Sequence, residues 1–149
     1  MGYVEDLRKI VGHRPLILTG AVVAILNEKE ELLLEQRTYP SGVWGLPGGL
    51  MELGESMEDT AKREVLEETN LVVENLKLID IYSGNEFYTV AENGDEFYSV
   101  TGAYYTTSFQ GEIVSSKKES LQCKFFPKHQ LPDQMVGSHR KMIEDLLNI

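Results

Sequence analysis

The sequence predicts an α+β domain in which helices cover a mixed β-sheet. The first observation is segment order: strand-like stretches, a helical stretch, further strand-like stretches and a terminal helical stretch follow one another. The second is length, because 149 residues are the usual size of one compact domain. The third is composition, since 42% hydrophobic and 26% charged residues are typical of a globular chain. We therefore expect residues 1–149 to form a single domain.

The first part of the chain is predicted to contain a short helix, two strands and a loop. Apolar residues at helical spacing predict the helix over residues 3–11. Aliphatic and β-branched residues dominate 16–26 and 31–37, and the polar stretch between them predicts a turn that joins two strands. Residues 39–49 are rich in Gly and Pro, so this stretch is predicted to be a loop.

The middle of the chain carries a helix with both of its ends marked. Ser56 and Asp59 form an S-x-x-D pattern, which is the acidic variant of a capping box and predicts the start of a helix. Apolar residues then recur at helical spacing as far as Asn70. The sequence therefore predicts a helix between Ser56 and Asn70.

The rest of the chain is predicted to be rich in strands and to end in a helix. Val, Ile, Tyr, Phe and Thr dominate residues 71–90 and 96–109, and an Asn-Gly pair between the two stretches indicates a hairpin. Residues 124–127 have the character of a last short strand. Residues 138–147 place four apolar residues on one face, as a terminal helix does.

Charge and cysteine content exclude several classes of protein. The net charge of -10 makes the approach of a bare polyanion such as duplex nucleic acid unfavourable. Cys123 is the single cysteine, so no intramolecular disulfide is expected. No apolar run approaches the roughly 18 residues of a membrane span, and no secretory signal opens the chain. We expect a cytoplasmic protein without a membrane or duplex nucleic-acid partner, and the sequence leaves open a homodimer.

Three glutamates of the predicted helix form the candidate metal site. On a helix, Glu67 and Glu68 lie about 60° to one side and about 40° to the other side of Glu64, so all three are expected to share one face. Like charges at this spacing repel one another, and a bound cation would reverse that effect. A solvated acidic surface is the alternative. The Gly-rich segment 45–49 favours a ligand site, because glycines let the backbone approach a ligand closely.

Residues 49–71 resemble the Nudix box, G-x5-E-x7-R-E-U-x-E-E-x-G-U, in which U is a bulky aliphatic residue. The one departure is Asn70, where the pattern has Gly, and Asn also tolerates the left-handed conformation of a helix C-cap. The chain is therefore identified as a member of the MutT-like Nudix hydrolase family, whose fold is an α/β/α sandwich. The matching positions are Gly49, Glu55, Arg63, Glu64, Val65, Glu67, Glu68 and Leu71.

The resemblance implies hydrolysis of a phosphoanhydride bond in a nucleoside diphosphate linked to another moiety, with Mg²⁺ or Mn²⁺ bound. It implies that Glu64, Glu67 and Glu68 are the metal-site carboxylates and that Glu64 and Glu67 take part in catalysis. The backbone carbonyl of Gly48 or Gly49 is expected to be a further metal ligand. A catalytically weak nucleotide-binding sensor on the same fold is the alternative function.

The resemblance also gives roles to residues around the glutamates. Arg63 is expected to orient a glutamate, and Glu55 is expected to support the loop or the helix N-terminus. Glu119, in a loop distant in sequence, is expected to supply a further catalytic carboxylate, with Glu112 as the next candidate and a solvated loop charge as the alternative. The choice of general base among the glutamates is left open.

Residues outside the box say little about the substrate. His13, His129 and His139 lie apart from the box and from one another, so they are assigned to structural or surface positions. Tyr88 follows the box at a distance that resembles the tyrosine of some dinucleoside-polyphosphate hydrolases, although an aromatic residue in a strand is ordinary. The sequence therefore leaves the particular nucleotide open.

Overall fold

The computed structural model of the chain describes residues 2–114 and 120–149. The predicted helix over residues 3–11 is confirmed, and the helices after Ser56 and near the C-terminus are confirmed with small changes in their bounds. The elements in chain order are α1 (Tyr3–Val11), β1 (Leu16–Ile25), β2 (Leu32–Arg37), β3 (Trp44–Gly45), β4 (Gly48–Leu50), α2 (Met57–Thr69), β5 (Val72–Glu74), β6 (Lys77–Tyr82), the 3-10 turn η1 (Asn85–Phe87), β7 (Tyr88–Val90), β8 (Glu96–Thr106), β9 (Ser108–Gln110), β10 (Ser120–Phe126) and α3 (Gly137–Leu147).

The central element is a five-stranded mixed sheet with the order β4-β1-β8-β6, in which β7 also pairs with β8. Strands β1 and β8 are parallel, in a register that runs from Leu16 opposite Phe97 to Ile25 opposite Thr106. The pairs β1 with β4, β6 with β8 and β7 with β8 are antiparallel. The predicted mixed sheet is therefore confirmed.

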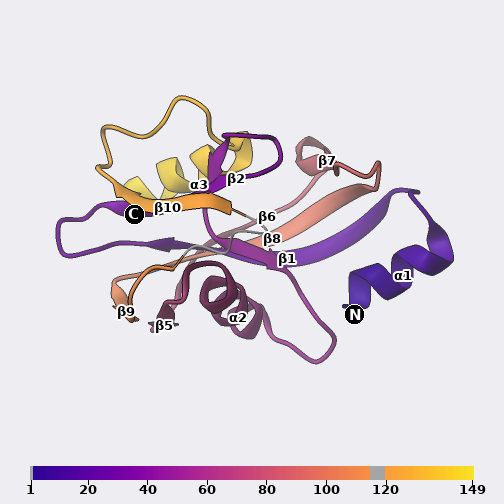
Figure 1. The fold of residues 1–149 in the computed structure, drawn as a ribbon, viewed down its shortest axis with the longest axis horizontal. Coiled ribbons are helices and arrows are strands. Elements are labelled where there is room, and N and C mark those ends of the chain that lie inside the picture. The colour runs from indigo at the N-terminus through magenta and orange to yellow at the C-terminus, as the bar shows by residue number, and fades with distance from the viewer. Residues whose placement is uncertain (1, 115–119) are drawn as a thin grey trace.

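Helices α2 and α3 cover the two faces of this sheet (Figure 1). Side chains of β1 alternate between the faces, because successive residues of a strand point to opposite sides. Ala21, Val23 and Ile25 pack in one buried cluster with residues of α2. Val22 and Ala24 pack in a second cluster with residues of α3. These two cores form the α/β/α sandwich that the resemblance implies.

Strand β2 follows β1 after a turn but belongs to a different sheet. It forms a three-stranded antiparallel sheet with the order β10-β2-β3, and the bridge between Leu26 and Leu32 connects the region to β1. Leu32, Leu33 and Leu34 are all fully buried, with alternate residues in the two core clusters. Since both faces of β2 are covered, its apolar residues are consecutive instead of alternating.

The structure corrects three of the sequence predictions. Residues 39–49, predicted to be a loop, contain β3 and β4, because their strand partners β2 and β1 are set by long-range contacts. The stretch 71–90 is broken into β5, β6, η1 and β7. The last strand, predicted over 124–127, begins at Ser120. Turn residues mark such breaks only weakly when the strands on either side belong to different sheets.

Helix α1 is attached to the rest of the protein by polar contacts. None of its described residues is buried, and the side chain of Ile10 is largely exposed. The N–H of Tyr3 donates to Glu52 Oε1 at 2.8 Å, and Arg8 Nη2 donates to the carbonyl oxygen of Glu96 at 2.6 Å. No helix in the described part of the chain is both long enough and apolar enough to cross a membrane.

Both ends of α2 are fixed as the sequence predicts. Ser56 Oγ accepts from the N–H of Asp59 at 3.0 Å, and Asp59 Oδ2 accepts from the N–H of Ser56 at 3.1 Å, which completes the capping box. At the other end, Asn70 is left-handed, with φ 67° and ψ 11°, and its N–H donates to the carbonyl oxygen of Leu66. The side-chain amide of Asn70 also donates to the carbonyl oxygen of Glu112 at 3.1 Å.

Asn70→Gly is expected to leave stability nearly unchanged, because Gly also accepts the left-handed conformation of this cap. The lost surface hydrogen bond to Glu112 contributes about 1 kcal/mol or less. Asn70→Ala, the matched control, is expected to lower the free energy of unfolding by about 1–2 kcal/mol, because alanine resists positive φ. Urea unfolding measures both changes. Equal losses in the two variants would contradict this account of the cap.

Candidate active site

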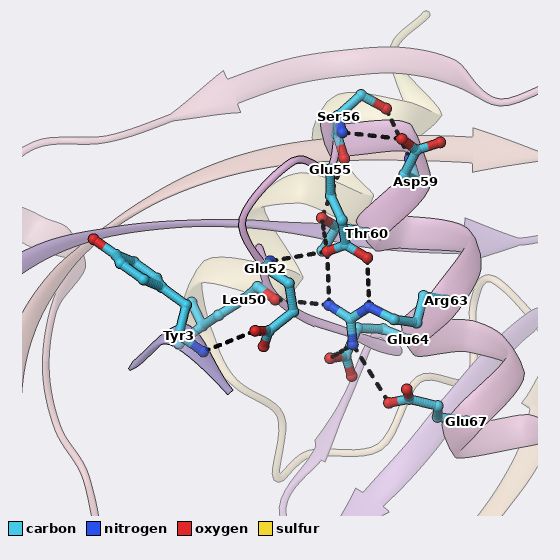
Figure 2. A network of polar contacts seen from close by, with 10 residues as sticks. All are labelled: Tyr3, Leu50, Glu52, Glu55, Ser56, Asp59, Thr60, Arg63, Glu64 and Glu67. Atoms are coloured by element: carbon cyan, nitrogen blue, oxygen red, sulfur yellow. Dashed lines mark hydrogen bonds and ion pairs between the residues drawn. The ribbon is translucent and has the colours of Figure 1, made fainter. Parts of the chain in front are cut away.

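Arg63 is the centre of a polar network at the start of α2 (Figure 2). Its Nε and Nη2 donate to the two carboxylate oxygens of Glu55 at 2.6 and 2.9 Å, which makes a two-pronged ion pair. Nη2 also donates to the carbonyl oxygen of Leu50 at 3.0 Å. Nη1 donates to Glu64 Oε1 at 2.8 Å and lies 3.4 Å from Glu67 Oε2. One guanidinium therefore connects the loop before α2 with two of the predicted metal-site glutamates.

The carboxylate of Glu55 joins this loop to the helix. Its Oε1 accepts from the N–H of Glu52 at 2.9 Å and from Thr60 Oγ1 at 2.9 Å, in addition to the bonds from Arg63. The bond from Arg63 is the main cause that lowers the pKa of Glu55 from 4.5 to about 2, against the opposing effect of burial. Glu55 is therefore ionised throughout the neutral range.

The glycines of β4 allow two glutamates of α2 to approach the sheet. The N–H of Gly48 donates to Glu68 Oε1 at 2.9 Å. A Cβ atom at Gly49 would lie 2.4 Å from the carboxyl carbon of Glu64, and one at Gly48 would lie 2.2 Å from the carbonyl oxygen of Ala21. Such distances are far below van der Waals contact. At Gly48 the clash would be with the backbone of β1, so only glycine fits there, whereas a side chain at Gly49 would displace the carboxylate of Glu64.

Glu68 forms a buried carboxyl pair with Glu35 of β2. The two residues are only 3% and 4% exposed. Burial raises the pKa of Glu68 far above its ordinary value, and the adjacent carboxyl groups of Glu35 and Glu64 raise it further, because each disfavours a second negative charge. This part of the site therefore holds more acidic groups than it can ionise without a proton or a cation.

Glu64, Glu67 and Glu68 are called the glutamate row below, and Glu67 lies at its more exposed end. Its side chain is 56% exposed, and Arg63 Nη1 stands between it and Glu64. Within residues 2–114 and 120–149, no three acidic, histidine or cysteine side chains are grouped closely enough to hold a metal ion by themselves. The structure thus brings Glu64 and Glu68 to β4 and holds Glu67 apart from them, across Arg63.

A cavity of about 170 Å³ adjoins the carboxylates. Gly48 and Gly49 line the cavity and also contact Glu68 and Glu64, so a ligand in it would lie beside the glutamate row. The other walls include residues of β1, β2, β7, β8, η1 and the start of α3. Among these wall residues, Arg37 is charged, His139 is polar, and Phe87 and Phe97 supply flat apolar surface.

Arg37 and His139 give the cavity its polar character. The guanidinium of Arg37 makes no ion pair or hydrogen bond with another residue in the described part of the chain. His139 is 6% exposed, and its Nδ1 accepts from the N–H of Leu46 at 3.0 Å. Burial, and then the charge of Arg37, lower the pKa of His139 to about 3, so this ring is neutral. His13 and His129 are exposed, as predicted.

Two other candidates lie apart from the cavity. Glu119 lies outside the described residues, so its role stays a prediction. Glu112 is exposed, and its carbonyl oxygen accepts from Asn70. Tyr88 is 42% exposed, and its hydroxyl donates to Glu96, so it faces β8 and solvent and does not line the cavity beside the glycines of β4.

Sequence reasoning missed Glu35 and Arg37 and assigned His139 only to structure or surface. A signal for Glu35 existed, because it follows three leucines in a strand and is therefore a carboxyl group in a predicted core position. Arg37 at the end of the same strand carried no such signal. The position of His139 depends on its contact with Gly45 and Leu46, which are distant in sequence, so the local sequence does not encode it.

The glutamate row and the glycines of β4 lie in and beside residues 49–71, the segment that resembles the Nudix box. The NUDIX domain model matches residues 17–146, and the chain belongs to this family of pyrophosphohydrolases.

Relatives with names or solved structures cover most of this chain. A protein of Bacillus subtilis (strain 168), whose name assigns it provisionally as an 8-oxo-dGTP diphosphatase, is 33% identical over 87% of this chain and 79% of its own length. The ADP-ribose pyrophosphatase of Methanocaldococcus jannaschii is 27% identical over 96% of this chain and 80% of its own. The crystal structure of a MutT NUDIX hydrolase from Burkholderia pseudomallei is 25% identical, with a TM-score of 0.75, and the match covers 88% of this chain and 98% of that one.

Glu55→Gln is expected to lower stability in a manner that depends on pH. The folded-state pKa of about 2 lies below the ordinary 4.5, so the ionised form stabilises the fold above about pH 4.5, and this contribution is lost as pH falls toward 2. The stability difference between the parent and Glu55→Gln, from urea unfolding, should be largest near about pH 6 and should narrow by about pH 3.

Glu58→Gln, at an exposed position of the same helix, is the control for this pH series. A gap between the parent and Glu55→Gln that stays constant over the same range would show that the ion pair with Arg63 does not stabilise the fold.

Proposed function

We propose that this chain hydrolyses a phosphoanhydride bond in a nucleoside diphosphate linked to another moiety, with Mg²⁺ or Mn²⁺ as cofactor. The observation that carries the proposal is the contact of Glu64 and Glu68 with the glycines of β4, which also line the cavity. Carboxylates and a ligand-sized cavity thus share one short strand.

The donor set fits a hard divalent cation. Glu64, Glu67 and Glu68 would hold it, together with the backbone carbonyl of Gly48 or Gly49. Mg²⁺ commonly takes only one or two protein carboxylates and completes its shell with waters and substrate phosphates, so three converged side chains are not needed beforehand. The bound cation would polarise the phosphoryl group and neutralise charge on the leaving group.

The remaining residues of the site would bind the substrate and hold the glutamates in position. Arg63 holds Glu64 through Nη1 and is itself held by Glu55, so the glutamate row keeps its orientation. Arg37 provides positive charge at the cavity wall, which an anionic substrate of a protein with net charge -10 requires. An ionised carboxylate of the row would accept the proton of the attacking water.

The names of the two relatives support a nucleotide substrate, since one is named for 8-oxo-dGTP and the other for ADP-ribose. Each of these molecules carries a phosphoanhydride bond. The alternative function, a nucleotide-binding sensor with little turnover, has no direct support in the site, because the glutamate row is intact. Turnover of a panel of nucleoside triphosphates, nucleotide sugars and ADP-ribose, with and without metal, would distinguish the two.

Glu64→Gln, Glu67→Gln and Glu68→Gln are each expected to reduce kcat by orders of magnitude at saturating Mg²⁺, because each removes a charged oxygen donor. Folding should survive, since glutamine keeps the shape of the side chain and the loss of like-charge repulsion offsets the lost bonds. Chromatographic measurement of the nucleoside monophosphate formed, with far-ultraviolet circular dichroism as the folding control, measures both effects.

Glu58→Gln serves again as the matched control, because Glu58 lies on α2 but outside the glutamate row and is exposed. It should keep parental kcat. Near-parental activity in all three variants, with an unchanged Mg²⁺ requirement, would show that the glutamates of α2 do not form the metal site.

A further inference from the structure

The polar groups that face the cavity are rich in hydrogen-bond donors and include no carboxylate. Among the described residues that line it, Arg37 and His139 are the nitrogen-bearing side chains, and the others are hydroxyl-bearing, apolar or glycine. The absence of a carboxylate here contrasts with the 24 acidic residues of the chain. The two nitrogen-bearing side chains of the cavity wall are therefore sources of hydrogen-bond donors, through the guanidinium of Arg37 and the protonated ring nitrogen of His139.

The hydrogen bond from Leu46 fixes the tautomer of His139. A ring nitrogen that accepts an N–H bond carries no proton, so the proton of this neutral ring is on Nε2. With Nδ1 occupied, Nε2–H is the free end of the ring, and it donates to no residue in the described part of the chain. The ring lines the cavity although His139 is only 6% exposed, so its N–H is a donor at the cavity wall that a bound ligand could use.

Gly45 makes room for both donors. A Cβ atom there would lie 2.8 Å from His139 Nδ1 and 3.4 Å from Arg37 Nε, so a side chain at this position would displace the imidazole. The charge of Arg37 also opposes a second proton on the ring, which keeps the ring in a single protonation state. Gly45 thus leaves space for the ring of His139, Leu46 fixes its tautomer, and Arg37 keeps it neutral.

The surroundings of His139 suit a nucleobase better than a phosphate. Phe87 and Phe97 supply flat apolar surface to the same cavity, against which an aromatic base can pack. Arg37 also lines this cavity and could contact a phosphate, but the divalent cation site proposed above lies on α2, at the other side of the glycines, and would attract the phosphates of a metal-bound substrate more strongly. A base in the cavity would thus place its phosphates toward the glutamate row.

We propose that His139 is a specificity-determining residue, which selects a nucleobase that presents a carbonyl oxygen to Nε2–H and disfavours one that presents an amino group. The selection rests on the proposed nucleotide substrate. A carbonyl oxygen accepts from Nε2–H, whereas an amino group would set two donors against each other and leave both unsatisfied in a buried site.

Inosine and adenosine 5'-monophosphates test this directly, because they differ at position 6 by a carbonyl oxygen and an amino group. Neither contains an anhydride bond, so calorimetric titration in EDTA measures binding without metal or turnover. The parent should bind the inosine form about tenfold more tightly, which is the effect of roughly one hydrogen bond. A failure of the proposed hydrolysis would leave this result unchanged, so the two failures are distinguishable.

His139→Asn is the decisive variant. The asparagine oxygen can take the place of Nδ1 and accept from Leu46, but the shorter side chain has no group at the position of Nε2. The preference should fall to within about twofold, with little loss of stability. Lys141→Gln, on the same helix but outside this cavity, should keep the full preference.

Ribose 5-phosphate, which has no base, separates the two sources of acceptor oxygen. Its affinity should be the same in the parent and in His139→Asn, and a matching loss for it and for inosine monophosphate would show that the donor meets phosphate instead. The proposal is also overturned if the parent binds the two nucleotides equally, if it binds neither at millimolar concentration, or if His139→Asn keeps the preference.

Nitrogen-15 NMR of the parent should show Nδ1 of His139 unprotonated at about pH 5, whereas a ring that titrates near its ordinary value of about 6.5 would contradict the fixed tautomer.

Discussion

The approach of β4 to both β1 and α2 is possible because Gly48 and Gly49 carry no side chain. Any Cβ atom at these positions would overlap the backbone of β1 or the carboxyl group of Glu64. Because β4 carries no side chains at these two positions, Glu68 of α2 can accept from the backbone N–H of Gly48, and a cavity lies beside the strand. Carboxylates, backbone and cavity meet at this point, so their arrangement in this chain depends on a close contact between main chains.

The charged groups around this contact differ in sign and in their tendency to ionise. Glu55 is paired with Arg63, which keeps it ionised, whereas Glu68 is buried beside Glu35 and resists ionisation. Arg37, in contrast, faces the cavity without a carboxylate partner among the described residues. The site therefore combines excess acidity on the helix side with positive charge on the cavity side. An anionic ligand and a cation can each find a complementary surface there.

The elements that were predictable from the sequence are those with local signals. The capping box at Ser56 and the left-handed cap at Asn70 fix α2, and apolar periodicity indicates α3, although Leu147, one of its apolar residues, is 46% exposed. The assignment of residues 48–50 to a strand was not predictable, because two glycines signal a loop until their partner β1 is known. Burial of Glu35 beside Glu68 likewise depends on two sheets meeting, which no spacing within one segment encodes.

Helix α1 shows how the loop before α2 is anchored from outside the core. Because no described residue of α1 is buried, hydrophobic burial contributes little to its attachment, and its amide protons should exchange with solvent through local opening long before global unfolding. Its first N–H is bonded to Glu52, whose own N–H is bonded to Glu55. Each opening of α1 would thus release one end of a short chain of hydrogen bonds that reaches Arg63, and the rigidity of the loop would fluctuate with the docking of the N-terminus.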